Sequence, residues 1–424
     1  MLQIAQIQEN KEAVISGLIR RNFNNAEIAI NSLLELDEKR KTVQQSNDAA
    51  LAEANQLAKQ IGQLMGQRKR EEAEEVKKKT AAFKTKSKKL GDELKAIEED
   101  LKQLLYTIPN VPNPIVPAGN SDEDNKVLST QGEIPQLYEG AQPHWDLIEK
   151  YDIIDFELGN KITGAGFPVY KGKGAKLQRA LVNFFLDQAT DAGYNEVQPP
   201  ILINQASGIA TGQLPDKEGQ MYHATEDDYY LIPTAEVPIT NIYRGEILKK
   251  EDLPKKHAGY TPCFRREAGS WGAHVRGLNR LHQFDKVEIV QIQHPDKSYE
   301  ALDDMSIYIQ SLLKKLELPY RVLLLCGGDL GFTSAITYDM EVFSAAQEKW
   351  LEVSSVSNFE TYQANRLKLR FKDGDKKTQL LHTLNGSALA LPRIVAAILE
   401  NNQTAEGIKI PEVLVPYCGF EWIN

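Results

Sequence analysis

Apolar side chains between residues 26 and 105 recur at alternating intervals of four and three positions, which is the spacing of the inward-facing positions of a coiled coil. The first run occupies positions 29, 33, 36, 40, 43, 47, 50, 54, 57, 61 and 64, and the polar residues Arg40 and Asn47 interrupt it. The second run occupies Val76, Thr80, Phe83, Ser87, Leu90, Leu94, Ile97, Leu101 and Leu104. Two runs of similar length predict an antiparallel helical hairpin that is capped by Asn24-Asn25, projects into solvent and extends for roughly 50 Å.

The pattern changes after the hairpin. Prolines at positions 109, 112, 114 and 117 precede an acidic stretch, and both features are typical of a linker. Beyond it, β-branched and aromatic stretches alternate with helical ones, and the chain contains no internal repeat. We therefore predict an N-terminal domain over residues 1–108 with a helical arm at about 26–105, a linker over residues 109–125, and one large α/β domain over residues 126–424.

Composition excludes several classes of protein. The 424 residues include 42% hydrophobic and 26% charged residues, which excludes a disordered tail or a small disulfide-bonded scaffold. The three cysteines are far apart and form no C-x-x-C pair, so we expect neither a disulfide framework nor a thiolate zinc cage. Neither a stretch of about 18 consecutive apolar residues nor a secretory signal pattern is found, and we expect a soluble cytoplasmic protein.

Charge is distributed unevenly along the chain. The formal net charge is −9, which argues against a protein that coats nucleic acid over its whole surface. Residues 68–89, however, contain ten lysines and arginines and four glutamates, a local net charge of +6 at the expected tip and second arm of the hairpin. Such a patch suits the phosphate backbone of an RNA. The alternatives are a solvated helix face, or a hairpin that serves as a dimerisation device or spacer.

Two segments predict a strand pair that carries charged and aromatic side chains. Residues 259–269 form an expected strand that runs into a glycine-containing loop, and residues 281–291 form the returning strand. Alternation along the second strand places five residues on one face, namely Arg280, His282, Phe284, Lys286 and Glu288. Arginine can bind phosphate, an aromatic ring can stack on a base, and a carboxylate can bind an amine. This face is a candidate nucleotide site, with a solvated sheet surface as the alternative.

Two further segments suit metal and phosphate binding. Glu352 and Ser355 stand at a probable strand end, and oxygen ligands of this kind suit Mg²⁺ that bridges substrate phosphates. Residues 384–393 lead into an apolar helix, and Pro392 is well placed at its start. Arg393 is then near the positive end of the helix dipole, where a phosphate is stabilised.

In this order, and after such a hairpin, these segments resemble the seryl-tRNA synthetases of class II over essentially the whole chain. Pro199-Pro200 resembles motif 1, residues 263–269 with 280–290 resemble motif 2, and residues 386–399 resemble motif 3. The segment Thr234-Ala235-Glu236 resembles the serine-binding segment of the family. The resemblance implies an antiparallel sheet flanked by helices and a homodimer. It also implies an ATP-dependent ligase that forms AMP and pyrophosphate, activates L-serine and charges tRNA(Ser), with tRNA(Sec) as an open second acceptor and no DNA or membrane partner.

The resemblance also implies roles for individual residues. Arg265 is expected to hold the α-phosphate and the serine carboxylate and Arg393 the γ-phosphate, so these two are the expected catalytic residues. The expected ATP-binding residues are Arg265, Arg266, Glu267, Arg280, Phe284, Glu352, Val353, Ser354, Ser355 and Arg393. The expected serine-binding residues are Thr234, Ala235, Glu236, Arg265, Glu288, Asn385 and Ser387. The expected Mg²⁺ ligands are Glu352 and Ser355, and the expected tRNA-binding residues are Arg68, Lys69, Arg70, Lys77, Lys78 and Lys79.

Three positions differ from the usual pattern of the bacterial family. Arg266 replaces a serine, Ala388 replaces a glycine, and Pro392 replaces the glycine before the motif 3 arginine. None of these changes removes a catalytic group. Two other functions are alternatives, a catalytically impaired paralogue that binds RNA and a ligase that loads an amino acid onto a carrier protein. The retention of Arg265, Glu288 and Arg393 disfavours the first, and the intact hairpin disfavours the second.

Overall fold

The computed structural model describes residues 1–216, 218–267 and 276–424, which form two compact units. The first unit consists of Met1–Ile19 and Phe23–Pro109, and the second of Arg20–Asn22 and Asn110–Asn424. Within these described ranges, no helix is both long and apolar enough to cross a membrane. The motif 2 residues Ala268 and Gly269 lie outside the described part of the chain.

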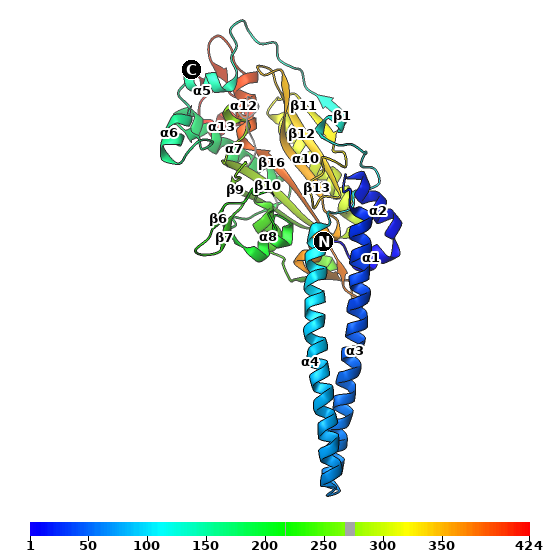
Figure 1. Ribbon diagram of the computed structural model, residues 1–424. Helices are drawn as coiled ribbons and strands as arrows, with labels where there is room; N and C mark the ends of the chain where they lie inside the picture. Colours follow the sequence, from blue (N-terminus) through cyan, green and yellow to red (C-terminus); the bar gives the residue numbers. More distant parts are fainter. Residues whose placement is uncertain (217, 268–275) are drawn as a thin grey trace. The chain divides into compact units, whose positions relative to one another are not determined.

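The first unit is built around a helical hairpin, which confirms the prediction from periodicity (Figure 1). The short helices α1 (Ile4–Glu9) and α2 (Lys11–Arg20) precede two long ones, α3 (Ala26–Gly66) and α4 (Arg70–Thr107). Side chains at the predicted inward-facing positions of both long helices are buried or half-buried, while most side chains between them are exposed. The two helices therefore pack along the seam that the 4-3 spacing predicts.

Polar residues within the hairpin are paired. Asn47, one of the two predicted interruptions, accepts a hydrogen bond at 2.7 Å from Ser87 Oγ on the opposite helix. Arg40, the other interruption, pairs at 2.9 Å with Asp37, a buried carboxylate that the spacing did not identify. Asn25 occupies the N-cap of α3 as expected, but its side chain makes no capping hydrogen bond. A buried polar pair such as Asn47 and Ser87 favours one register of the two helices.

An eight-stranded sheet organises the described part of the second unit. Its strand order is β1-β11-β12-β13-β16-β10-β9-β4, and all neighbours are antiparallel except β4 and β9. The strands are β1 (Lys126–Gln131), β11 (Tyr320–Leu324), β12 (Ile336–Ser344), β13 (Lys349–Asn358), β16 (His382–Ala390), β10 (Gln283–Gln293), β9 (Lys255–Phe264) and β4 (Asn195–Glu196). This sheet agrees with the fold class predicted from the sequence.

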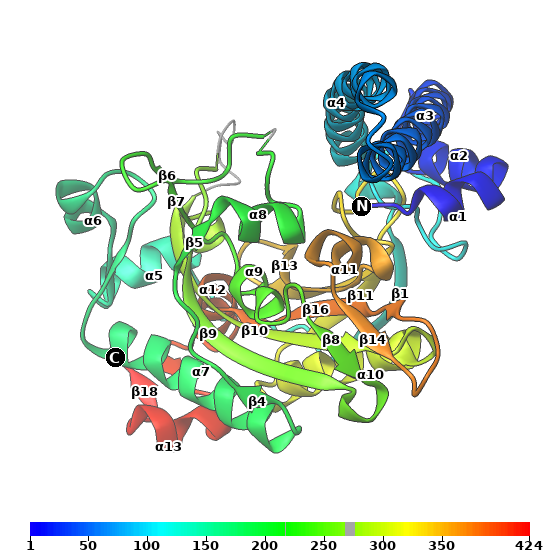
Figure 2. The same ribbon diagram turned by 90° about the horizontal axis from the view of Figure 1, so that it is seen from below.

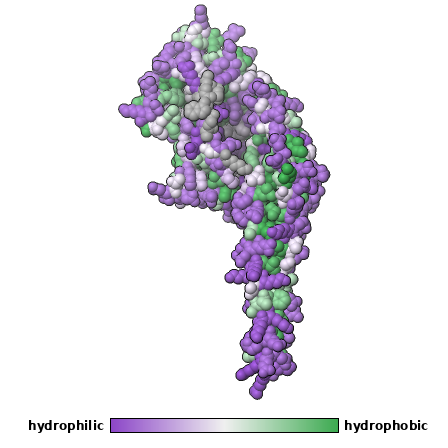
Figure 3. Space-filling model, viewed as in Figure 1, coloured by the Kyte–Doolittle hydropathy of each residue, from purple (hydrophilic) through white to green (hydrophobic). Residues whose placement is uncertain are grey.

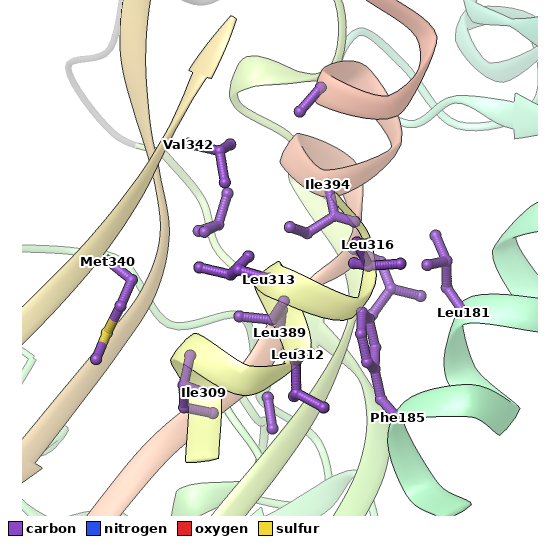
Figure 4. Packing of buried hydrophobic residues seen from close by; sticks show 14 of the residues in the cluster. Leu181, Phe185, Ile309, Leu312, Leu313, Leu316, Met340, Val342, Leu389 and Ile394 are labelled. Carbon is purple, nitrogen blue, oxygen red and sulfur yellow. The ribbon is translucent and has the colours of Figure 1, made fainter. Parts of the chain in front are cut away.

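Three helices cover one face of the sheet and form the main hydrophobic core, shown in Figure 4. They are α7 (Gly172–Asp191), α10 (Ser298–Lys315) and α12 (Leu391–Asn401). Val287 and Ile289 of β10 alternate with Lys286 and Glu288 and point into this core. The buried apolar face of the sheet is the main source of hydrophobic stabilisation, and it leaves the opposite face for polar side chains.

Shorter elements lie over and around the opposite face. Figure 2 shows α8 (Gln205–Thr211), α9 (Glu236–Asn241) and α11 (Thr361–Leu367) on this side. The remaining helices and turns are α5 (His144–Lys150), α6 (Phe156–Ile162), α13 (Val415–Cys418), η1 (Asp122–Asp124), η2 (Lys250–Asp252), η4 (Gly277–Asn279), η5 (Pro295–Lys297) and η6 (Glu412–Leu414). The small sheets contain β2 (Ile154–Asp155), β3 (Val169–Tyr170), β5 (Leu202–Asn204), β6 (His223–Ala224), β7 (Tyr229–Leu231), β8 (Ile247–Lys249), β14 (Arg370–Lys372), β15 (Gln379–Leu380), β17 (Ile408–Lys409) and β18 (Trp422–Ile423). All three cysteines are free and buried, as their spacing indicated.

Candidate active site

A buried carboxylate, Glu288, lies at the centre of the polar face of the sheet. Lys286 Nζ lies 2.6 Å from Glu288 Oε2, and Asn385 Nδ2 donates to Glu288 Oε1 at 2.7 Å. Ser387 is directly opposite Glu288 in the β10–β16 pair, and its hydroxyl donates to Oε2 at 3.4 Å. These contacts satisfy a group that would otherwise be costly to bury. Glu288 therefore forms a preorganised acceptor for a small cationic group.

The segment Thr234-Ala235-Glu236 lies beside Lys286 and Glu288, at the start of α9. Lys286 Nζ donates to Thr234 Oγ1 at 2.8 Å, so one lysine links Thr234 to Glu288. Ala235 belongs to a small apolar cluster with Ile239 and Val290, so its side chain contributes packing and no hydrogen bond. Glu236 Oε1 accepts from Gln363 Nε2 at 2.6 Å. Burial of this carboxyl raises the pKa of Glu236 to about 7, against the opposing effect of the Gln363 hydrogen bond.

The raised pKa of Glu236 predicts a pH-dependent stability. An unfolded chain releases this proton near pH 4.5, whereas the folded protein keeps it until about pH 7. Because the folded state binds more protons in that interval, the free energy of unfolding should fall as pH rises through it, by at most about 3 kcal/mol. Urea unfolding at pH 5 and pH 8 measures this fall. Glu236→Gln should remove it, while Glu412→Gln, a change of an exposed glutamate, should keep the wild-type dependence.

Arginine and aromatic side chains meet where β9 and β10 pair. The Arg265 guanidinium lies 5.2 Å from the centre of the Phe284 ring, and the Arg265 amide donates to the His282 carbonyl at 2.9 Å. Arg280 Nη1 pairs with Glu267 Oε2 at 2.8 Å. The structure thus brings four of the predicted ATP-binding residues together. The Arg266 side chain is also exposed there. Its backbone amide donates a hydrogen bond to the Gln220 carbonyl at 2.9 Å.

Arg393 lies in the first turn of α12, where the sequence placed it. Its Nη1 donates to the Glu352 carbonyl at 2.6 Å, and its Nε donates to the Asn279 carbonyl at 3.2 Å. Pro392 occupies the first turn, where its missing amide proton costs nothing. The change from glycine at position 392 is therefore compatible with the helix start.

A bulge in β13 brings Glu352 and Ser355 onto one face. Three positions apart, they would point to opposite faces of a regular strand. The β12–β13 register shifts between Met340 and Glu341, so that Glu352 pairs with Glu341 while Ser355 pairs with Asp339. Both residues are accessible to solvent, whereas Val353 and Ser354 between them are buried. Bulges of this kind commonly redirect side chains next to active sites.

One expectation for this segment is wrong, while the ATP contacts expected at Val353 and Ser354 stay predictions. Glu352 and Ser355 lie inside β13 rather than at its end. The side chain of Val353 belongs to the hydrophobic core, so it cannot touch a nucleotide on the other face. The Ser354 hydroxyl donates to the Ser387 carbonyl at 2.6 Å and is likewise turned inward. Only the backbone of these two residues is available to a ligand.

Asp339 is a further site residue that the sequence did not reveal. Its side chain is buried and hydrogen-bonds Ser355, and its Oδ1 has no hydrogen-bond partner among the described residues. Burial, followed by the neighbouring Glu352 carboxylate, holds the pKa of Asp339 well above its ordinary value. Asp339 lies in β12 with no recognised motif around it, so its place beside Ser355 became visible only from the strand pairing.

The six predicted RNA-binding cations lie at the distal end of the hairpin. Arg68 and Lys69 belong to the turn between α3 and α4, Arg70 begins α4, and Lys77, Lys78 and Lys79 lie two turns further on. All six side chains are exposed, and Figure 3 shows the hydrophilic surface at this end. Lys69 and Lys77 each pair with a glutamate of α4, and exposed pairs of this type are weak. These cations remain available to an anionic partner.

Comparisons with known proteins agree across both units. Residues 1–112 match the family model described as seryl-tRNA synthetase N-terminal domain, and residues 220–402 match the tRNA synthetase class II core domain (G, H, P, S and T). A serine–tRNA ligase of Salinibacter ruber is 49% identical over 100% of this chain and 99% of its own length. One from Geobacter sulfurreducens is 45% identical over 99% of both chains. The crystal structure of a Pyrococcus horikoshii seryl-tRNA synthetase complexed with ATP has a TM-score of 0.93, at 33% identity over 100% of this chain and 99% of that one.

Proposed function

The chain belongs to the seryl-tRNA synthetase family of class II aminoacyl-tRNA synthetases, and we propose that the site around Glu288 and Arg265 performs the serine–tRNA ligase reaction of that family. The enzyme uses ATP to activate an amino acid before it charges a tRNA. The observation that carries the assignment to this site is the hydrogen-bonded group of Glu288, Asn385 and Ser387, together with the Arg265–Phe284 pair. A full-length match that includes the hairpin disfavours both a carrier-protein ligase and an impaired paralogue.

We propose that Glu288 binds the ammonium group of serine. A carboxylate can accept about four hydrogen bonds, so the three contacts with Lys286, Asn385 and Ser387 leave room for a substrate donor. Asn385 and Ser387 would then pair with the serine hydroxyl, and Thr234 and Glu236 would close the pocket. Alanine would leave these buried polar groups unpaired, whereas threonine would be excluded because its methyl group needs additional space.

Adenylate formation follows from the positions of the arginines. The serine carboxylate attacks the α-phosphorus in line, a new carboxylate–phosphorus bond forms, and pyrophosphate leaves with the electrons of the broken bond. Arg265 would stabilise charge at the α-phosphate while Phe284 stacks on adenine. Arg393 and Arg280 would stabilise the leaving pyrophosphate. The attacking group is already an anion, so this step requires no protein nucleophile and no general base.

We propose that Glu352 and Ser355 hold Mg²⁺, as the donor chemistry at the β13 bulge supports. Carboxylate and hydroxyl oxygens suit this ion, and the unpaired Oδ1 of the buried Asp339 is a further oxygen beside them. No group of three His, Cys, Asp or Glu that could hold a metal is found in the described ranges, which fits an ion that also relies on substrate phosphates. When bound, Mg²⁺ would neutralise charge on the triphosphate of ATP.

The Mg²⁺ proposal predicts the behaviour of Glu352→Gln. The Mg²⁺ concentration that gives half-maximal ATP–pyrophosphate exchange should rise at least about tenfold, because a ligand carboxylate is lost. Glu348→Gln changes the same charge in the exposed β12–β13 turn and should leave this concentration unchanged. An unaltered Mg²⁺ requirement in Glu352→Gln would contradict the assigned ligand.

For the second step we propose that the hairpin binds tRNA(Ser). The 3′-terminal adenosine hydroxyl would attack the seryl carbonyl and release AMP, while the cations at residues 68–79 contact the RNA backbone.

We accordingly propose residues 1–108 as the tRNA-binding domain, 109–125 as a linker and 126–424 as the catalytic domain. Charging assays with tRNA(Ser) and tRNA(Sec) transcripts determine whether one or both are acceptors. We propose that the reaction takes place in the cytoplasm, where ribosomes use charged tRNA.

We also propose that the enzyme is a homodimer, with the second copy covering α7 and the edge strand β4. A cavity of about 470 Å³ lies there, lined by residues that include Gln178, Arg179, Tyr260 and Asp285. Within the described part of the chain, Gln178 Oε1 and the Tyr170 hydroxyl at this cavity have no hydrogen-bond partner. β4 is the last strand in the order of the large sheet, and an edge strand is open to pairing with another chain. Sedimentation should give twice the 47.6 kDa chain mass, and a mass of one chain would contradict the dimer.

A further inference from the structure

A completely buried histidine, His144, connects helix α5 to the turn η4. Its Nε2 accepts a hydrogen bond from the Leu278 amide at 2.9 Å, and its Nδ1 lies 2.6 Å from Glu400 Oε1 on α12. Because an amide nitrogen can only donate, Nε2 must be the acceptor, and Nδ1 carries the proton that is donated to Glu400. The imidazole therefore joins η4 to α12, and these two hydrogen bonds fix the orientation of its ring.

The network continues from Glu400 to Arg393. Gln347 Nε2 donates to Glu400 Oε1 at 2.8 Å, and Asn279 Nδ2 donates to Gln347 Oε1 at 3.1 Å. Ser344 donates to the other oxygen of Glu400. The carbonyl of Asn279 then accepts from Arg393 Nε at 3.2 Å. An unbroken path of hydrogen bonds thus runs from His144 to the arginine proposed to bind the γ-phosphate.

The backbone of η4 depends on this contact. Gly277 has φ +66°, and a Cβ at this position would come within 2.2 Å of His144 Nε2. Glycine is thus required both for its conformation and for the close approach of the imidazole. The next residue after η4 is Arg280, which pairs with Glu267 in the proposed nucleotide site. His144 consequently fixes the backbone from which both Asn279 and Arg280 project.

We infer that His144, Glu400 and Gln347 are positioning residues that hold η4 so that Arg393 and Arg280 are preorganised for the triphosphate of ATP. This inference rests on the proposed function of the two arginines. Displacement of a positioned group by a fraction of an ångström weakens binding and catalysis without removing any group that touches the substrate. The proposed serine site at Glu288 shares no residue with this network. A change in the network should therefore raise the KM for ATP and leave the KM for serine unchanged.

The test is ATP–pyrophosphate exchange by the full chain with His144→Leu and His144→Gln. His144→Leu should raise the KM for ATP about tenfold and leave the KM for serine unchanged, because it removes both hydrogen bonds of the imidazole. His144→Gln should recover part of the loss, since its carboxamide oxygen can replace Nε2 as the acceptor for the Leu278 amide. His382→Gln is the matched control, since His382 is a partly buried imidazole that pairs with Ser298 outside the network.

A second variant covers the case in which His144→Leu does not fold. Gln347→Ala keeps the buried imidazole but frees Asn279, and it should raise the KM for ATP about threefold or more. Normal ATP constants in the His144 and Gln347 variants, or equal increases for ATP and serine, would overturn the inference. Arg393→Ala in the same assay tests the proposed function separately. A normal KM for ATP in Arg393→Ala would contradict the role of Arg393 itself. A raised KM for ATP in Arg393→Ala, together with normal values in the His144 and Gln347 variants, would contradict only the network.

Discussion

Arg265→Ala should abolish serine activation, with a decrease of at least about 10³-fold in the rate of ATP–pyrophosphate exchange. Arg265 is the cation proposed to touch both reacting groups, the serine carboxylate and the α-phosphate. Its guanidinium also lies over Phe284, 5.2 Å from the ring centre, so its loss also removes a contact of the proposed adenine platform. The side chain is exposed, and we expect the folded structure to tolerate its removal.

Two controls make the Arg265→Ala result specific. Arg370→Ala removes an arginine on the small sheet β15-β14-β8, away from the proposed site, and should exchange normally. Filter binding of tRNA(Ser) to Arg265→Ala should match the wild type, because the proposed RNA contacts lie on the hairpin. Exchange within tenfold of the wild type would contradict the assignment of Arg265.

Deletion of residues 30–104 should leave serine activation intact and abolish tRNA charging. All residues of the proposed adenylation site belong to the second unit, which has its own hydrophobic core and lacks the deleted segment. The deletion removes the six exposed cations at residues 68–79 and therefore the proposed electrostatic contact with RNA phosphates. Exchange and aminoacylation assays on the same preparation measure the two activities.

A charge-reversal series sharpens the deletion experiment. Replacement of Lys77, Lys78 and Lys79 by glutamate keeps the hairpin but reverses the exposed charge, and it should weaken tRNA binding and reduce its salt dependence. Replacement of the neighbouring Glu71, Glu72 and Glu74 by glutamine is the matched control, which should not weaken binding. Normal charging by the deletion variant would contradict the role of the hairpin.

The sequence was informative where structure depends on neighbours along the chain. The 4-3 spacing predicted the hairpin because the two helices pack through residues that recur every three or four positions. Strand alternation placed Lys286 and Glu288 on one face of the predicted strand, and the structure has both beside each other while the intervening Val287 lies in the core. The proline at 392 and the apolar run after it also indicated where α12 begins.

Features that depend on pairing between distant segments were not predictable in this way. The bulge that turns Glu352 and Ser355 to one face arises from the register of β13 against β12, and nothing in the local sequence marks it. The contact between His144 and Glu400 joins residues 256 positions apart. The raised pKa of Glu236 likewise results from burial, a property of the folded chain.

The most direct test of the account is ATP–pyrophosphate exchange with each of the twenty amino acids, in the presence of Mg²⁺ and without tRNA. We predict exchange with serine alone, because the polar groups of Asn385 and Ser387 beside Glu288 are proposed to pair with the serine hydroxyl. Efficient exchange with a different amino acid would contradict the assigned serine pocket. Absence of exchange with all twenty would contradict the proposal that this site forms an adenylate.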